Sequence, residues 1–215
     1  MTTRRLRAQE TRQAEPGRAA RRWRLGALLA TVAILAIGAG VGLAGTWVAV
    51  ERGAGFGAVR VGPWTAFPRN GSLEADPYSR AIVAKSGGLP LGLGEGLSFT
   101  ASRDSEGRPL IGSCTYRVVG RVPQTRFWTL TLETPGGALV PNPARRYGFT
   151  SAEIVRDGRG VFTVTVAPDV QPGNWLPVRE GRFELVMRLY DTPLSGTSTV
   201  IDPGRMPQIL QDRCR

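Results

Sequence analysis

Hydrophobic and polar positions divide the chain into one long apolar segment and a following region in which they alternate. Residues 25–50 carry no charged side chain, and eight arginines lie in the 24 residues before them. A helix of this length rises about 39 Å, enough to cross a ~30 Å hydrocarbon layer with some tilt. An arginine-rich flank is typical of the cytoplasmic side. The pattern predicts a signal-anchor transmembrane helix over residues 25–50, with the lipid bilayer as its partner.

A cleaved secretory signal is the alternative interpretation of this segment. The apolar core of such a signal needs only about 7–15 residues, roughly half of the run found here. A small-x-small triplet at Gly42–Ala44 nonetheless offers a cleavage point after Ala44. Length and flanking charge favour the retained anchor, and whether the segment is ever cleaved stays open.

The segments around the apolar run show little periodicity. Residues 1–24 are rich in arginine and alanine, and we expect a disordered basic cytoplasmic tail. Residues 51–75 are interrupted by glycine and proline, which predicts a stalk and an extended lead-in with strand-like pieces near 59–61 and 64–67. Asp76 and Pro77 then suit the N-cap and first position of a short helix running through Lys85, with Gly87 and Gly88 as its stop.

Beyond residue 89 apolar and polar residues alternate with a period of two. In residues 127–133, Trp128, Leu130 and Leu132 share one face and two threonines take the other. In residues 183–190, four apolar side chains lie opposite Glu184, Arg188 and Tyr190. Glycine-rich turns separate these stretches. The pattern predicts a mainly β fold, an antiparallel β-sandwich or jelly-roll-like outer domain over residues 76–215 with one short helix.

Charge and composition exclude several classes of function. The formal net charge is +11, but the first 24 residues hold +6 of it, and the rest is spread without a basic run, so we predict no nucleic-acid binding. The chain has no histidine, the usual general base and the commonest metal ligand. We therefore predict no metal site, no cofactor and no catalytic residue, which favours a non-enzymatic role.

The two cysteines, Cys114 and Cys214, both follow the predicted membrane helix. On the outer side of a membrane a disulfide between them would persist, and it would tie the C-terminal segment to a central strand. Sequence spacing does not supply the required Cα separation below ~7 Å. A disulfide and two unpaired thiols therefore both remain open.

Several stretches together resemble the domain of unknown function 1214 family. A Pro-Gly-Asn-Trp-Leu-Pro turn at residues 172–177 precedes a strand that ends in Met-Arg-Leu-Tyr at 187–190, and matching pieces occur at 76–81, 116, 126–130, 141–142 and 146–147. The resemblance implies a jelly-roll β-sandwich of the bacterial envelope. It also implies a companion membrane protein of the domain of unknown function 1254 family, which is fused to this module in longer relatives. With the predicted topology, the N-terminus would be cytoplasmic and the outer domain periplasmic, at the bacterial inner membrane.

Six side chains in or beside these stretches are of the kinds that bind an anionic or sugar-like ligand through forked hydrogen bonds and stacking. They are Arg146, Tyr147, Asn174, Trp175, Arg188 and Tyr190. A structural interpretation is favoured over this one. In it Trp175 fills the core at a turn, and Arg188 is a solvated or paired strand residue.

Carboxylates offer a weaker signal. Asp104 and Glu106 lie in one turn and Asp157 in another, and turn chemistry explains both. Calcium would need six to eight oxygens, and glycoside hydrolysis would need two carboxyls ~5–9.5 Å apart across a cleft.

Three hypotheses follow from the sequence. The leading one is an anchored periplasmic domain that binds a partner protein or an envelope component. An enzyme acting on glycan or lipid with Asp or Glu is the second, and it predicts two facing carboxyls beside Trp175 or Trp128. A small-molecule binding module built around Arg188 and Tyr190 is the third.

Overall fold

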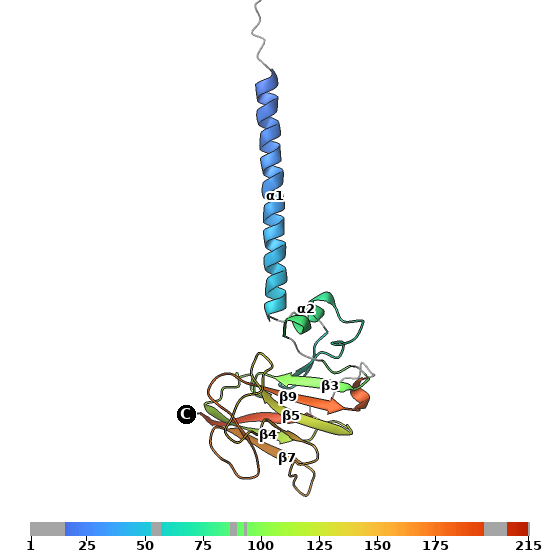
Figure 1. The fold of residues 1–215 in the computed structure, drawn as a ribbon, viewed down its shortest axis with the longest axis vertical. Coiled ribbons are helices and arrows are strands. Elements are labelled where there is room, and N and C mark those ends of the chain that lie inside the picture. Colours follow the sequence, from blue (N-terminus) through green and yellow to red (C-terminus); the bar gives the residue numbers. More distant parts are fainter. Residues whose placement is uncertain (1–15, 53–56, 87–89, 93, 196–205, 215) are drawn as a thin grey trace, which may run out of the picture. The chain divides into compact units, whose positions relative to one another are not determined.

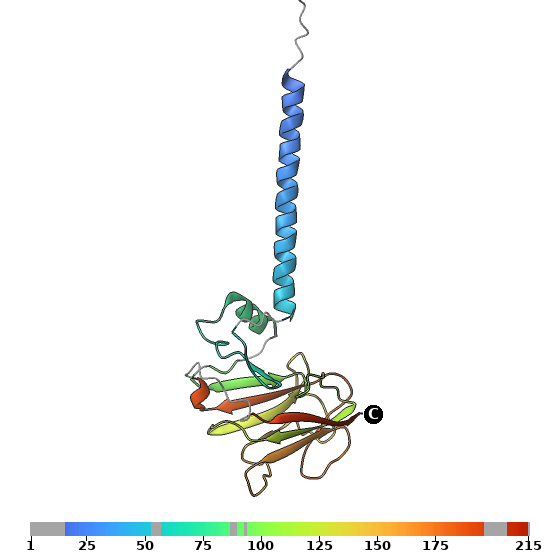
Figure 2. The same cartoon turned by 180° about the vertical axis from the view of Figure 1, so that it is seen from behind.

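A long helix and a β-rich body make up the described chain (Figures 1 and 2). The computed structural model describes residues 16–52, 57–86, 90–92, 94–195 and 206–214. The chain divides into two units between Glu51 and Arg52. We call residues 57–214 the β body and treat each unit by itself.

Helix α1 spans Pro16–Arg52. Its segment from Trp23 to Glu51 is long and apolar enough to cross a membrane by length and composition, a test that a signal sequence also passes. Side chains from Trp23 to Val48 are exposed on every side of the helix. The helix starts nine residues before the predicted Leu25, so residues 16–24 are helical and not a disordered tail. Proline at the first helical position and the alanines and arginines after it favour this early start. Residues 1–15 of the expected tail lie outside the described residues.

The β body contains two sheets in its described residues. The larger has the order β1 (Val59–Val61), β2 (Trp64–Ala66), β3 (Gly96–Ala101), β9 (Glu184–Tyr190), β5 (Phe127–Glu133) and β6 (Gly148–Thr150). The smaller has the order β10 (Gln208–Cys214), β4 (Cys114–Gly120), β7 (Phe162–Ala167) and β8 (Asn174–Pro177). Figure 1 shows β3, β9 and β5 in one layer and β4 and β7 in the other.

The predicted mainly β fold is confirmed, and its core lies between the two sheets. Trp128 of β5 and Phe162 of β7 meet across the gap with ring centroids 5.0 Å apart. Leu130 and Met187 of the larger sheet and Val164 of the smaller are fully buried, as their alternating positions predict. All pairings are antiparallel except the parallel pairing of β7 with β8, which differs from the expected antiparallel sheet.

The lead-in segment contributes to the core, where we expected a stalk as far as residue 75. Strands β1 and β2 pair with each other, and β2 pairs with β3, so both belong to the larger sheet. Trp64 is fully buried, and its indole Nε1 donates to the carbonyl oxygen of Pro207 at 2.7 Å. An indole of this size provides enough apolar surface to draw its segment into the core.

Helix α2 (Pro77–Ser86) begins as its sequence predicts. Oδ1 of Asp76 accepts hydrogen bonds from the backbone N–H groups of Tyr78 and Ser79, both at 3.0 Å. These bonds satisfy donors that the first helical turn leaves free. The expected stop at Gly87 and Gly88 lies outside the described residues. A short 3₁₀ helix, η1 (Pro193–Ser195), follows β9.

Strand β10 is held to β4 covalently as well as by pairing. Cys114 and Cys214 face each other in the register of the two strands and form a disulfide, with their Cα atoms 3.9 Å apart. Ile209 of β10 is fully buried. The C-terminal strand is thus fixed to the smaller sheet at both ends.

Candidate functional site

A cavity of about 630 Å³ lies on the face of the larger sheet that points away from the core. Its floor carries polar side chains of four strands, namely Thr65, Ser98, Thr100, Glu133, Glu184 and Arg188. Its apolar walls come from α2 and the loops beside it, namely Phe67, Ile82, Val83, Pro90 and Leu91. This combination of apolar walls and a few polar groups is typical of small-molecule sites.

The period of two in the strands places the floor residues. In β9 the core side takes Leu185, Met187 and Leu189, so Glu184 and Arg188 point to the opposite face. Glu133 at the end of β5 is the register partner of Glu184. Two carboxyl groups thus come from adjacent positions on neighbouring strands.

Arg188 is paired within the sheet. Its Nη1 donates to Oγ1 of Thr131 and its Nη2 to Oε1 of Glu133, both at 3.0 Å. Oγ1 of Thr131 also donates to Oε1 of Glu133 at 2.9 Å. The side chain of Arg188 is 30% exposed and that of Glu133 is 10% exposed. The guanidinium therefore compensates the charge of Glu133 and retains a surface toward the cavity.

Glu184 has no such compensation. Burial raises the pKa of its carboxyl group above the ordinary 4.5, and the nearby negative charge of Glu133 raises it further. Among the described residues no hydrogen bond to this carboxyl group is found. A desolvated carboxylate without a partner gains stability from a proton or from a bound cation.

Asn174 and Trp175 lie away from the cavity, in β8. The amide of Asn174 is buried, accepts from the backbone N–H of Val155 at 2.9 Å and donates to the carbonyl oxygens of Val155 and Thr163. Residues 174–177 form a strand, not the turn that we expected, and Leu176 fills the core while Trp175 is only half-buried. Nε1 of Trp175 donates to the carbonyl oxygen of Ala167 at 3.0 Å. The parallel pairing with β7 explains the difference, because it points alternate residues of this short segment inward.

The remaining predicted residues are dispersed. Nη1 of Arg146 donates to the carbonyl oxygen of Trp175 at 3.3 Å, and its guanidinium lies over the ring of Phe149. Tyr147 is half-buried beside it in the chain. Tyr190 packs against Phe127 with ring centroids 5.8 Å apart and lines a separate depression with Arg126 and Asp191. The six predicted side chains therefore do not form one pocket, and only Arg188 lines the cavity.

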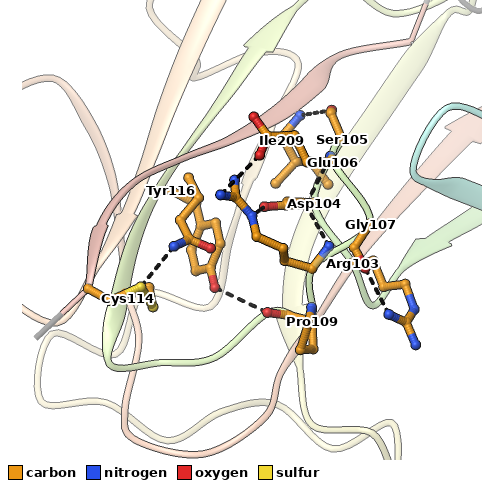
Figure 3. A network of polar contacts seen from close by, with 12 residues as sticks. Arg103, Asp104, Ser105, Glu106, Gly107, Pro109, Cys114, Tyr116 and Ile209 are labelled. Atoms are coloured by element: carbon orange, nitrogen blue, oxygen red, sulfur yellow. Dashed lines mark hydrogen bonds and ion pairs between the residues drawn. A yellow bond between two sulfur atoms is a disulfide. The ribbon is translucent and has the colours of Figure 1, made fainter.

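The carboxylates in turns have structural partners. Asp104 is buried and accepts from the backbone N–H groups of Glu106 and Arg108 and from Nε of Arg108, the last at 2.7 Å. Figure 3 shows this turn beside β10, where Ser105 and Ile209 exchange hydrogen bonds, each at 2.9 Å. The hydroxyl of Tyr116 donates to the carbonyl oxygen of Pro109 at 3.3 Å. The network joins the turn to β4 and β10.

Other carboxylates named from the sequence do not converge with Asp104. Asp157 accepts from the backbone N–H groups of Arg159 and Val161 within its own hairpin, and these bonds lower the pKa of its carboxyl group. Glu180 is exposed in a third turn. The pair that does lie together, Glu133 and Glu184, was missed. The alternating pattern placed Glu184 on the polar face, but nothing in the sequence indicated that β5 lies beside β9.

Part of the β body matches a known protein family. Residues 95–194 match the model of a family described as "Protein of unknown function (DUF1214)". This region is similar to that family over 100 residues. The resemblance predicted from the sequence is thereby confirmed over residues 95–194, which we call the DUF1214 domain, while the piece at 76–81 lies outside the match. It supplies all three charged residues of the cavity, whereas α2 and Thr65 lie outside it.

A solved structure shares the fold. The chain is similar to the VPA0106 protein from Vibrio parahaemolyticus with 23% identity and a TM-score of 0.52, over 67% of this chain and 37% of that one. An uncharacterized protein from Burkholderia cenocepacia matches with 15% identity and a TM-score of 0.39, over 55% of this chain and 30% of that one. The chain thus spans about a third of each of these structures. No match was found among curated proteins.

Proposed function

We propose that this protein is a single-pass inner-membrane protein that holds its DUF1214 domain in the periplasm, where the domain binds an envelope component in the cavity. The observation that carries the proposal is α1, whose apolar side chains are exposed on all sides between Trp23 and Val48. Such a surface is stable in lipid and unfavourable in water.

Two further features support this orientation. Eight arginines precede the apolar segment, as is typical of a cytoplasmic flank. The β body contains the Cys114–Cys214 disulfide, and disulfides persist in the periplasm and are rare in the cytosol. Both features favour a periplasmic β body.

Protease treatment of spheroplasts tests the orientation. A chain tagged after residue 215 should lose its tag when protease is added to spheroplasts and keep it in intact cells. Protection of the tag until the inner membrane is lysed would contradict the proposed orientation.

The mass of the mature chain separates an anchor from a signal. A retained anchor gives a full-length product in the membrane fraction. A soluble periplasmic product that begins at Gly45 would show cleavage after Ala44 and would contradict the anchor.

We further propose a companion membrane protein of the domain of unknown function 1254 family as the partner. The Vibrio protein supports a modular arrangement, because this chain covers only 37% of it, and the shared fold is therefore joined there to further sequence. Co-purification in mild detergent should recover the companion with the tagged chain. A chain that remains a solitary monomer while the companion is present would contradict this part of the proposal.

Binding is favoured over catalysis because the candidate residues predicted from the sequence already form hydrogen bonds or ion pairs within the protein. Asp104, Asp157, Asn174 and Arg188 are all engaged within the protein. The cavity brings together a desolvated carboxyl group without a described hydrogen bond, several hydroxyl groups and apolar walls.

A further inference from the structure

We infer that the cavity on the larger sheet binds a small organic cation, a primary ammonium group attached to a compact hydrocarbon, with the ammonium group on Glu184. This inference rests on the proposed binding function and names the chemical class of its ligand. It follows from the charge on the floor, the character of the walls and the size of the space.

The floor carries one uncompensated negative charge. The charged groups among the described lining residues are Glu133, Glu184 and Arg188. Arg188 contacts Glu133 at 3.0 Å, so that pair is neutral in sum. Glu184 is left with Glu133 as its charged neighbour, and the described lining residues of α2 bring no charge toward it. A cation is therefore the ligand that the local electrostatics favour.

Hydroxyl groups on the same floor add acceptors for an ammonium group, and the nearest to Glu184 in the strand register is Thr100, opposite Val186 of β9. An ammonium ion has three donors and no acceptor. Ser98, Thr100 and Thr65 bring hydroxyl oxygens to the same floor, from β3 and β2. Ser98 faces Arg188, four positions along β9, so Thr100 is the hydroxyl residue best placed to accept a second N–H bond beside Glu184.

The opposite wall suits a hydrocarbon group. Ile82 and Val83 come from α2, and Pro90 and Leu91 from the loop after it. Covering these side chains with a hydrocarbon removes apolar surface from water. The volume of about 630 Å³ lies within the ~300–1,000 Å³ range of sites for small molecules.

A metal ion and an anion fit less well. No group of three or more acidic, histidine or cysteine side chains suited to a metal ion occurs among the described residues. Hard cations such as calcium take six to eight oxygen ligands. An anion would face the uncompensated charge of Glu184, since Arg188 already contacts Glu133.

Cyclohexylamine and cyclohexanol test the inference on the purified full-length chain in detergent. The two probes have the same ring and differ in the ammonium group, which stays charged near neutral pH because its pKa is close to that of lysine, about 10.4. Ligand-observed NMR at pH 7.5 should give a dissociation constant at least tenfold lower for cyclohexylamine. Glu184→Gln should weaken cyclohexylamine binding at least tenfold and leave cyclohexanol binding unchanged.

Glu180→Gln is the matched control, because Glu180 lies in an exposed turn outside the cavity. It should leave the binding of both probes unchanged. Lowering the pH toward 4.5 provides a second measurement on the unmodified chain. Protonation of Glu184 should then weaken cyclohexylamine binding while cyclohexanol binding stays constant.

Two results would overturn the inference. One is an absence of cyclohexylamine binding, and the other is equal affinity for both probes with no effect of Glu184→Gln. Either result would leave the spheroplast and co-purification results untouched, so failure of the ligand class is distinguishable from failure of the proposed function.

Discussion

Asn174 is a buried amide with all of its described bonds inside the protein. It joins the backbone at Val155 to β7 through one accepted and two donated hydrogen bonds. Asn142 makes a similar set in an exposed loop, with Val140 and Arg146 as partners. The bonds of Asn174 should therefore contribute more to stability than those of Asn142, because Asn174 is buried from water and Asn142 is only half-buried.

Asn174→Ala should lower the free energy of unfolding by about 2–4 kcal/mol, since it removes three hydrogen bonds of a buried amide to the backbone of Val155 and Thr163. Asn142→Ala is the control and should cost less than about 1.5 kcal/mol. Urea unfolding of both variants measures the difference. Equal losses would show that the bonds of Asn174 are not a major source of stability.

Glu184 should make stability depend on pH in a direction that is unusual for a glutamate. Burial raises the pKa of its carboxyl group in the folded state, so the folded chain binds this proton more tightly than the unfolded chain does. The contribution of Glu184 to stability is therefore largest at low pH and is lost as the pH rises from the ordinary glutamate pKa through the raised one.

Urea unfolding of the wild type and of Glu184→Gln at pH 4 and pH 7 tests this direction. The variant should be more stable relative to the wild type at pH 7 than at pH 4. Asp76 and Asp157, whose pKa values are lowered, destabilise both proteins equally at acid pH and cancel in the comparison. A difference that does not change with pH would contradict the assignment.

Residue positions were predictable from the sequence as far as a single strand extends. Alternation placed Glu184 and Arg188 on one face, and the structure has both in the cavity. The partner of Arg188 was not predictable, because Glu133 lies 55 residues away and meets it only through the pairing of β5 with β9. Sequence periodicity carries no information on which strands are neighbours.

Among the elements, α2 depends on Asp76, the residue that caps its N-terminus. Asp76→Ala should fray the N-terminus of α2, because Oδ1 and Oδ2 of Asp76 accept from the backbone and the hydroxyl of Ser79. Asp76→Asn should keep most of the helix, since asparagine also caps well. Hydrogen exchange of the amides of residues 78–80 measures the effect. Equal protection in the two variants would mean that packing alone holds α2.

The disulfide should stabilise β10 through the chain entropy of the loop that it closes. Cys214→Ser breaks the bridge at its exposed end, and the free energy of unfolding should fall by about 2–5 kcal/mol. Amides of β10 should exchange faster than those of β7. A reducing agent should destabilise the wild type by the same amount and leave the variant unchanged, and a reductant-insensitive wild type would contradict this.

Sequence patterns correctly predicted the positions of several strands and of the helix cap. They were wrong where pairing with a distant strand determined the secondary structure. The strand at residues 127–133 has the predicted face, and Asp76 caps α2 as expected. Residues 172–177 were expected as a turn because of their prolines and asparagine, but β7 offers residues 174–177 a parallel partner. The pairing partner, not local propensity, determined this element.

At the scale of the whole molecule, the β body should fold without α1. Its buried core, from Val61 to Ile209, is made of residues that belong to the body itself. A fragment of residues 57–215 should therefore unfold in one cooperative transition, with a free energy of about 5–15 kcal/mol. Urea titration followed by near-ultraviolet circular dichroism measures it. A broad transition without near-ultraviolet signal would show that the core needs the preceding residues.

The two-unit organisation was readable from the sequence because an uncharged run of 26 residues contrasts sharply with everything after it. The order of strands in the sheets could not be predicted from the sequence. The larger sheet brings β1 and β2 next to β3, and β9 between β3 and β5, although long stretches of chain separate these elements. Such long-range pairings depend on the summed packing of the core, which no local window contains.

Cys114 is separated from its disulfide partner Cys214 by 100 residues, so the two thiols become available at different times during synthesis. At a synthesis rate of about 5–20 residues per second, the first thiol emerges about 5–20 s before the second. During that interval Cys114 has no native partner and can be captured by a foreign thiol. Correct assembly of the smaller sheet then requires an oxidant that acts late, or an isomerase that releases the premature adduct.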